Sequence, residues 1–168
     1  MPDFKKKDSY QIRLENFIKD VLVECPSCSK KATVISPNFI ERNEKPHEIK
    51  LICSSCGYNK KLIENPDIIL HQSSSKTITG KYLILGTSVD PYFHLPLWLK
   101  KDCCNNIFWA YNYEHLEFLK NHIESKLRER NLDEISNKSI GSRLPKWMTS
   151  KKNRETVLKT IQQLSIKK

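Results

Sequence analysis

Two pairs of cysteines decide the fold of this chain: Cys25-Pro26-Ser27-Cys28 and Cys53-Ser54-Ser55-Cys56-Gly57. In each pair, a gap of two residues lets both sulfurs of one tight turn reach the same ion. Two such pairs supply four thiolates, which is the ligand set of a tetrahedral zinc site. Gly57 stands directly after the second pair, where such a turn often requires a positive φ. The sequence therefore predicts one zinc ion held by Cys25, Cys28, Cys53 and Cys56.

The stretch between the two pairs has the pattern of a hairpin. Residues 32–36 and 47–53 are rich in β-formers, and proline and asparagine residues mark the connection between them. Residues 58–64 could add a third strand, which completes the layout of a zinc ribbon. Because four thiolates leave no coordination position for water, the zinc is predicted to be structural and the protein is predicted not to be an enzyme.

Other chemistry of the four thiols stays open. A thioredoxin-like C-x-x-C motif needs one pair at the start of a helix that follows a strand, and two pairs flanking a hairpin fit this poorly. Disulfide bonds are a further alternative, which a secreted protein would favour. The segment 1–7 contains three lysines, but no apolar segment of a secretory signal follows it. We therefore expect a cytoplasmic protein with reduced thiols. No stretch reaches the ~18 apolar residues of a membrane span, so no membrane partner is expected.

The fold class predicted for the whole chain is α+β, with an N-terminal helix and the zinc ribbon first. Apolar residues recur at helical spacing ahead of the first cysteine pair, with Asp8 or Ser9 as the cap of this helix. The apolar stripe consists of Tyr10, Leu14, Phe17, Ile18, Val21 and Leu22. Helix and ribbon form a predicted first domain over residues 1–70. Residues 71–76 contain three consecutive serines and are predicted to be a loop or linker.

A second α+β domain is predicted over residues 77–168, and it begins with a small β-sheet. The middle one of three candidate strands carries Pro96, which suits an edge strand or an irregular segment. The candidate strands lie at residues 81–89, 92–99 and 107–111.

Helices are predicted for the remainder of the second domain. A long helix should run from its cap Asn112 to about Asn131, and a short helix should precede Pro145. A final helix is predicted over residues 153–164. The residues that it turns inward are Val157, Leu158, Ile161 and Leu164.

Several runs, together with the two cysteine pairs, resemble a family of small bacterial proteins. These runs are LPLWL at 95–99, CC at 103–104, WAYN at 109–112, EHL at 114–116, LRER at 127–130, SRLPKWM at 142–148 and KNRE at 152–155. The family is described as zinc-ribbon-containing, of the transcription-factor-IIB type. The resemblance implies zinc and a bacterial cytoplasmic protein, and it implies no mechanism. The chain departs from the family pattern at Asn105 and Asn106, where the pattern has glycine.

The adjacent Cys103 and Cys104 suggest several roles. They could form a vicinal disulfide, act with a histidine as a nucleophile, or join a second metal site. The histidines considered for such a site are His94, His115 and His122. The plain alternative is one buried and one partly exposed thiol. Motifs of phosphate-binding loops, zinc proteases and serine hydrolases are absent, so no small-molecule substrate is expected.

Positive charge is concentrated towards the carboxyl end. The formal net charge is +10, and from Ser136 onward nine basic residues accompany one acid, Glu155. This asymmetry suits contact with nucleic acid, and a solvated surface is the plain alternative. The residues predicted to contact nucleic acid are Lys146, Lys151, Lys152, Arg154 and Lys159. Trp147 could stack on a base or anchor the core.

Helical spacing adds detail to this prediction. It places Lys152, Lys159 and Gln163 together on the solvent side of the final helix. The alternative function is that of a protein–protein interaction module, such as an adaptor or a toxin-binding protein. In that case the zinc ribbon is a scaffold that presents a strand edge or an apolar face to the partner.

Overall fold

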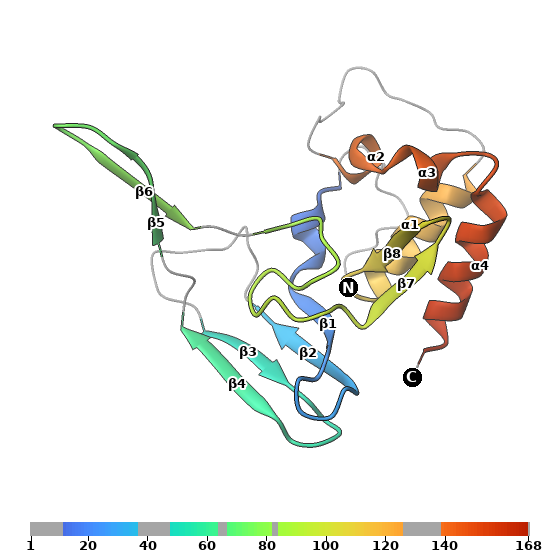
Figure 1. Cartoon of the computed structure of the whole chain (residues 1–168), viewed down its shortest axis with the longest axis horizontal. Coiled ribbons are helices and arrows are strands. Elements are labelled where there is room, and N and C mark those ends of the chain that lie inside the picture. The colour runs from blue at the N-terminus through green and yellow to red at the C-terminus, as the bar shows by residue number, and fades with distance from the viewer. Residues whose placement is uncertain (1–11, 37–47, 64–66, 82–83, 126–138, 168) are drawn as a thin grey trace.

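The two cysteine pairs and the strands beside them form one antiparallel sheet at one end of the molecule (Figure 1). The computed structural model describes residues 12–36, 48–63, 67–81, 84–125 and 139–167. The sheet has the order β1-β2-β3-β4, formed by β1 (Asp20–Glu24), β2 (Lys31–Ile35), β3 (Glu48–Ile52) and β4 (Asn59–Ile63). The strands predicted at 32–36, 47–53 and 58–64 are therefore confirmed to within about one residue at each end.

One face of this sheet is buried. Alternate residues of the first three strands point into the core, as expected for a sheet that is half-covered. These residues are Val21 and Val23 of β1, Ala32 and Val34 of β2, and Ile49 and Leu51 of β3. The register places Val21 opposite Val34 and Val34 opposite Leu51, so the buried side chains form a continuous row across the sheet.

The predicted α+β fold with an N-terminal helix is wrong. Leu14–Phe17 form a single 3-10 turn, η2, and Val21 belongs to strand β1. The apolar residues before the first cysteine pair fit both a helical and an alternating period, and pairing of β1 with β2 along its whole length selects the strand. Asp8, Ser9 and Tyr10 lie outside the described residues. The described chain consists mostly of small antiparallel sheets, and its first α-helix begins at Tyr113.

A second hairpin occupies the segment that was predicted to be a linker. Strands β5 (Asp67–Gln72) and β6 (Thr77–Lys81) pair antiparallel, and the Ser73 N–H donates to the Lys76 carbonyl at 2.8 Å to close the turn. Only the serines and Lys76 lie outside the strands. The predicted strand at 81–89 is also wrong, because β6 ends at Lys81 and residues 84–88 belong to no strand. The hairpin projects from the body of the molecule (Figure 1).

A third hairpin carries the adjacent cysteines. It consists of β7 (Leu99–Cys103) and β8 (Asn106–Ala110), which confirms the strand predicted at 107–111. Its two-residue turn has Cys104 at φ 53° and Asn105 at φ 58°. Two positive φ values in sequence are typical of a type I′ turn, which suits the right-handed twist of a hairpin. Asparagine adopts this conformation more readily than most residues, so Asn105 serves here without glycine.

The predicted three-stranded sheet of the second domain is wrong. Among the strands of the described ranges, β7 and β8 pair only with each other. Residues 92–98 are irregular apart from isolated bridges of Pro96 with Val89 and of Leu97 with Val23. The Asp90 carboxylate organises this segment by accepting backbone N–H groups of three residues that follow it. The segment around Pro96 was predicted to be an edge strand or irregular, and it is irregular.

The helices follow β8. Helix α1 (Tyr113–Glu124) begins as predicted, because the Asn112 Oδ1 atom accepts the His115 N–H at 2.8 Å. Its predicted end near Asn131 is wrong, since Ser125 is already extended; residues 126–131 lie outside the described ranges. The remaining helices are α2 (Ile140–Arg143), α3 (Lys146–Thr149) and α4 (Arg154–Ser165). None of the helices in the described ranges is long and apolar enough to cross a membrane.

One core joins the cysteine sheet to the helices. Helices α1 and α4 pack on each other and on the β7–β8 hairpin, with Val157, Ile161 and Leu164 of α4 buried as predicted and Leu158 half-buried. Backbone hydrogen bonds connect β1 to this body. They run from Leu22 N to Tyr111 O (2.7 Å), from Trp98 N to Leu22 O (2.9 Å) and from Glu24 N to Pro96 O (2.9 Å). Strand β1 is therefore held by the body as well as by its own sheet.

Asn112 is the residue through which α1 is attached to η2 and β1. Besides capping α1, its Nδ2 atom donates to the carbonyls of Phe17 (3.0 Å) and Asp20 (3.1 Å). We expect Asn112→Ala to lower the free energy of unfolding by about 2 kcal/mol, the sum of a cap and further hydrogen bonds. Asn112→Ser keeps a capping oxygen and should lose only about half as much. Urea unfolding measures both, and equal losses for the two variants would contradict this account.

Candidate metal centre

The two cysteine turns have the same backbone geometry. In each turn the N–H of the first cysteine donates to the carbonyl five residues later, and its own carbonyl accepts the N–H four residues later. The bonds are Cys25 N to Lys30 O (2.8 Å), Ser29 N to Cys25 O (2.9 Å), Cys53 N to Tyr58 O (2.9 Å) and Gly57 N to Cys53 O (3.0 Å). The turns connect β1 to β2 and β3 to β4, and both lie at the same end of the sheet (Figure 1).

The structure brings all four cysteine sulfurs together. They lie within 4.8 Å of one another, and the pairs Cys25 with Cys56 and Cys28 with Cys53 are each separated by 3.7 Å. A tetrahedron with metal–sulfur bonds of about 2.3 Å has its sulfurs about 3.8 Å apart. The sulfurs of a disulfide would be about 2.05 Å apart. The four cysteines could therefore hold one metal ion, and the residues present fit a tetrahedral ion.

The pKa values of the cysteine thiols in the cluster favour a bound cation. Burial raises the pKa of Cys53, but hydrogen bonds from the backbone N–H groups of Cys56 and Ser55 and with the Cys56 and Cys25 thiols together outweigh burial and lower this pKa to about 6. At Cys28 the Lys30 N–H acts to lower the pKa, and burial together with the neighbouring sulfurs outweighs it and raises the pKa to about 12. One thiolate thus opposes the formation of the next at this separation. A metal ion between the sulfurs would remove that conflict.

The positive φ predicted for Gly57 is confirmed at 75°, and the first turn contains an equivalent residue. Ser29 follows Cys28 as Gly57 follows Cys56, and it has a φ of 57°. No role was predicted for Ser29 from the sequence, although its place directly after the cysteine pair was the available signal.

The two positions differ in what they tolerate. No atom lies within 4 Å of a Cβ built on Gly57, so Gly57→Ala adds backbone strain and no clash. We expect this variant to lose about 1 kcal/mol of stability, whereas Ser29→Gly should be neutral or gain up to about 1 kcal/mol. Thermal unfolding of the zinc-loaded protein measures both changes. A Gly57→Ala protein as stable as the wild type would show that the second turn does not require its positive φ.

The second metal site considered around Cys103 and Cys104 is not formed. Within the described ranges, the four cysteines of the sheet are the only cluster of three or more potential ligands. The two vicinal sulfurs lie 3.8 Å apart, with Cys103 buried and Cys104 half-buried. Burial raises the pKa of the Cys104 thiol, which disfavours the reactive thiolate.

The histidines of α1 belong to the core. His115 is buried, stacks on Phe17 with ring centroids 4.8 Å apart and accepts the Tyr111 N–H at its Nδ1 atom. Burial lowers the pKa of His115 to about 3, so the ring is neutral at physiological pH. His122 is also buried and stacks on Phe118, whereas His94 is exposed. Packing therefore accounts for both helix histidines.

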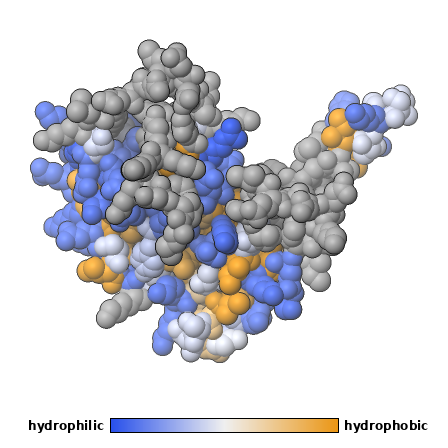
Figure 2. All heavy atoms as spheres, turned by 180° about the vertical axis from the view of Figure 1, so that it is seen from behind, coloured by the Kyte–Doolittle hydropathy of each residue, from blue (hydrophilic) through white to orange (hydrophobic). Residues whose placement is uncertain are grey.

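The five basic residues predicted to contact nucleic acid lie on α3, on the turn after it and on α4. Four of them are exposed and Arg154 is half-buried. Lys146 begins α3, Lys151 and Lys152 form the turn, Arg154 begins α4 and Lys159 lies in its middle. Seen from behind, the side of the molecule that carries α4 is largely hydrophilic (Figure 2). Lys159 and Gln163 are exposed on α4, whereas Lys152 is exposed in the turn that precedes α4.

Two other residues of the carboxyl-terminal segment take part in the fold. Lys167 donates to the Trp98 carbonyl at 2.7 Å, and its ammonium lies 4.0 Å from the centre of the Trp98 ring. Trp147 is half-buried and packs against the core, and its carbonyl accepts a hydrogen bond from Asn153. Lys167 and Trp147 thus contribute packing and hydrogen bonds within the protein.

No protein-family model, curated protein or solved structure matches this chain. The resemblance to bacterial zinc-ribbon proteins stays a prediction from the sequence. The function has to be inferred from the geometry of the four cysteines and from the basic surface.

Proposed function

We propose that this protein is a non-catalytic zinc-ribbon protein that associates with nucleic acid through its basic carboxyl-terminal surface. The observation that carries the metal part is the spacing of the four sulfurs, 3.7 Å in two pairs and at most 4.8 Å overall. Zinc is the ion that four thiolates in tetrahedral arrangement most often bind in proteins. Metal analysis of the purified full chain should find one zinc per molecule.

The zinc has a structural role in this proposal. Four cysteine ligands fill a tetrahedral coordination sphere and leave no position for water or a substrate. The cysteine turns lie at the lower end of the molecule in Figure 1 and α3 at the upper end, so the four cysteines and α3 are at opposite ends in this view. Zinc therefore stabilises the sheet, and contact with a partner is left to another surface.

The basic surface is formed by Lys146, Lys151, Lys152, Arg154 and Lys159. None of these five side chains makes an ion pair within the described part of the chain, where the ion pairs involve Glu48 and Glu24 instead. Unpaired cations on one surface attract a polyanion and release its counterions on binding. Phosphate contacts of this kind carry no base preference, so binding to many sequences is expected.

Neutralising Lys152 and Lys159 together should weaken nucleic-acid binding about equally across sequences. Both side chains are exposed on the α4 side, so each can contribute one phosphate contact. The slope of log affinity against log salt should fall by roughly two contacts, about 0.7–0.9 per contact. Stability should change little, because exposed unpaired lysines contribute little to folding.

Titration of the wild type and Lys152→Ala/Lys159→Ala against single-stranded and duplex DNA and RNA measures this slope. Lys100→Ala is a suitable control, because Lys100 lies on β7 and pairs with Glu24 at 3.7 Å. Absence of wild-type binding at roughly 50 mM salt, or an unchanged slope in the double variant, would exclude the nucleic-acid proposal.

A protein–protein interaction module is the second candidate function, and the β5–β6 hairpin favours it. Ile69 and Ile78 on this hairpin are 61% and 40% exposed. Hydrophobic atoms are visible on the hairpin where it projects in Figure 2. A lone two-stranded hairpin is marginally stable in water, and a protein partner could cover it. In this case a partner captured from the native host should stay bound at high salt and be lost by Ile69→Thr/Ile78→Thr.

A further inference from the structure

A pocket of about 270 Å³ lies between the end of α1 and the segment that joins α3 to α4. Its lining residues come from these two parts of the chain: Ile123, Ser125, Met148, Thr149, Ser150, Lys151 and Arg154. Ligand pockets in proteins typically measure about 300–1,000 Å³. The pocket lies just below this range, so it can take at most one small ligand or one monomer of a polymer.

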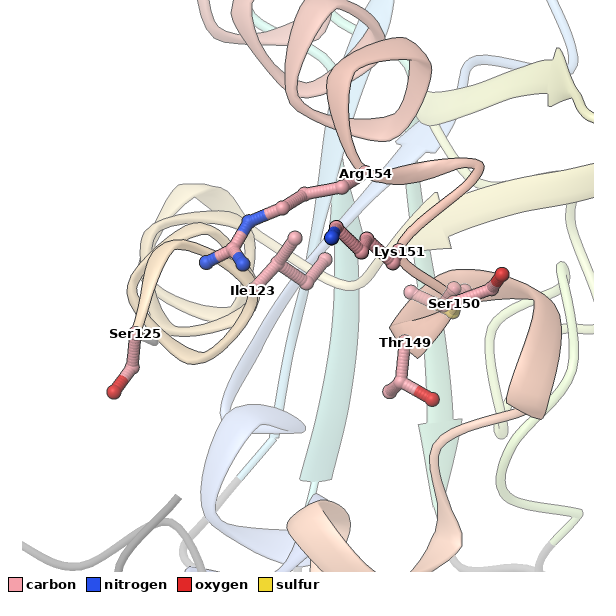
Figure 3. A pocket seen from close by; sticks show the side chains of 7 residues that line it. Ile123, Ser125, Thr149, Ser150, Lys151 and Arg154 are labelled. Atoms are coloured by element: carbon pink, nitrogen blue, oxygen red, sulfur yellow. The ribbon is translucent and has the colours of Figure 1, made fainter. Parts of the chain in front are cut away.

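The lining combines an apolar floor with a charged rim. Ile123 and Met148 are buried, with 3% and 6% of their surface exposed. Lys151 and Arg154 add two positive charges, and no acidic residue lines the pocket. In Figure 3 the charged ends of Lys151 and Arg154 turn towards the Ile123 side chain. A ligand seated here would meet apolar atoms on one side and two cations on the other.

The two cations are available for a ligand. Neither Lys151 nor Arg154 makes an ion pair within the described ranges, and one guanidinium nitrogen of Arg154 donates to the Glu124 carbonyl at the end of α1. This bond covers the partial negative charge of the helix end and orients the arginine, and its other N–H groups are left for a ligand. Thr149 and Ser150 add hydroxyl groups to the same lining.

Helix α4 adds a further positive contribution at this place. Arg154 is its first residue, and the Asn153 side chain does not cap the first turn but donates to the Trp147 carbonyl. The first N–H groups of α4 thus have no side-chain cap beside the pocket. The amino end of a helix with free N–H groups favours an anion, and this effect adds to the charges of Lys151 and Arg154.

We propose that this pocket binds one nucleoside phosphate, with the phosphate on Lys151 and Arg154 and the base against Ile123 and Met148. The proposal rests on the proposed association with nucleic acid and adds the place where one nucleotide is held. A nucleotide matches the pocket because it joins an anion to a flat ring with apolar faces, and inorganic anions lack such a ring. The nucleotide can be a unit of a single strand or a free mononucleotide.

The test uses the full chain, adenosine 5′-monophosphate, adenosine and a labelled single-stranded oligonucleotide. Calorimetry measures affinities, and methyl NMR signals of Ile123 and Met148 report where the ligand lies. Lys151→Ala should weaken binding of the mononucleotide about tenfold, because a charge-assisted contact is lost. Lys120→Ala is the control, since Lys120 is an exposed lysine of α1 that neither lines the pocket nor belongs to the basic surface, and it should change this affinity less than about twofold.

The outcomes separate the pocket from the basic surface. If the mononucleotide fails to bind, or if Lys151→Ala and Lys120→Ala weaken its binding equally, the pocket proposal is overturned even when the oligonucleotide binds. If the mononucleotide binds as expected and the oligonucleotide does not, the pocket is supported for free nucleotides and the proposed function is overturned. If the mononucleotide displaces the oligonucleotide, the pocket holds a unit of the strand. Adenosine binding as tightly as its monophosphate would contradict the assigned role of the two cations.

Discussion

Replacing Cys53 by serine should abolish zinc binding and unfold the β3–β4 part of the cysteine sheet. Cys53 is buried, its sulfur lies 3.7 Å from that of Cys28, and the cluster in the described ranges contains no fifth ligand residue to replace it. Structural zinc contributes an apparent binding free energy of about 10–16 kcal/mol in comparable peptides. That is as large as the whole stability of a typical domain, about 5–15 kcal/mol. The sheet around the cysteine turns cannot be expected to persist without the ion.

The loss should be uneven across the molecule. Strand β1 is hydrogen-bonded to Tyr111, Trp98 and Pro96 of the body, whereas β4 lies at the edge of the sheet and, within the described part of the chain, pairs with β3 alone. Hydrogen exchange of the variant should therefore show lost protection first at position 53, Gly57 and β4, while α1 and α4 keep theirs. Metal analysis and circular dichroism complete the measurement.

Cys104→Ser is the matched control for the zinc prediction. It makes the same chemical change at a half-buried cysteine in the β7–β8 turn, outside the four-cysteine cluster. This variant should keep one zinc per chain and the exchange pattern of the wild type. A Cys53→Ser protein with a full complement of zinc, or a wild type without metal, would refute the metal centre.

The buried His115 should make the protein lose stability as the pH falls below about 6.5. Burial lowers its pKa from 6.5 to about 3 in the folded protein. Between these two pKa values the unfolded chain binds a proton at this histidine and the folded protein does not, so acid favours unfolding. The stability that this histidine contributes is complete above pH 6.5 and declines on the order of 1.4 kcal/mol for each pH unit below it.

The variant His115→Asn tests this origin of the acid sensitivity. Asparagine can keep an acceptor near the Nδ1 position for the Tyr111 N–H, and it does not titrate. The variant loses the ring stacked on Phe17, so it should be less stable at pH 7 but have a flatter profile between pH 7 and 5. His94→Asn changes an exposed histidine and should keep the wild-type slope. Urea unfolding of zinc-loaded protein at several pH values measures the slopes. Equal slopes for His115→Asn and the wild type would exclude His115 as the cause.

Both the metal centre and its turns were accessible from short stretches of sequence. A pair of cysteines two residues apart constrains its own turn, and Gly57 marks the backbone conformation that this turn needs. The cap Asn112 and the inward stripe of α4 likewise depend on residues within one or two helical turns. Such features follow from local geometry, which hardly depends on the rest of the chain.

The segment before the first cysteine pair shows why other elements could not be predicted. Its apolar residues satisfy a helical and a strand period at once, and only the partners β2, Leu97 and Tyr111 select the strand. The β5–β6 hairpin was missed for a related reason. Its serine-rich turn has the composition of a linker, and the pairing of the two flanking strands decides the structure.

The amino-acid sequence by itself determined that four cysteines can form one metal site, that helices begin at Asn112 and near Asn153, and that positive charge gathers at the carboxyl end. Only the tertiary structure decided that β1 is a strand, that His115 is buried against Phe17, and that Ile123 and Arg154 line one pocket. The first group depends on neighbours in the chain, whose spacing is fixed by covalent geometry. The second depends on contacts between distant segments, because burial and pairing are properties of the folded core.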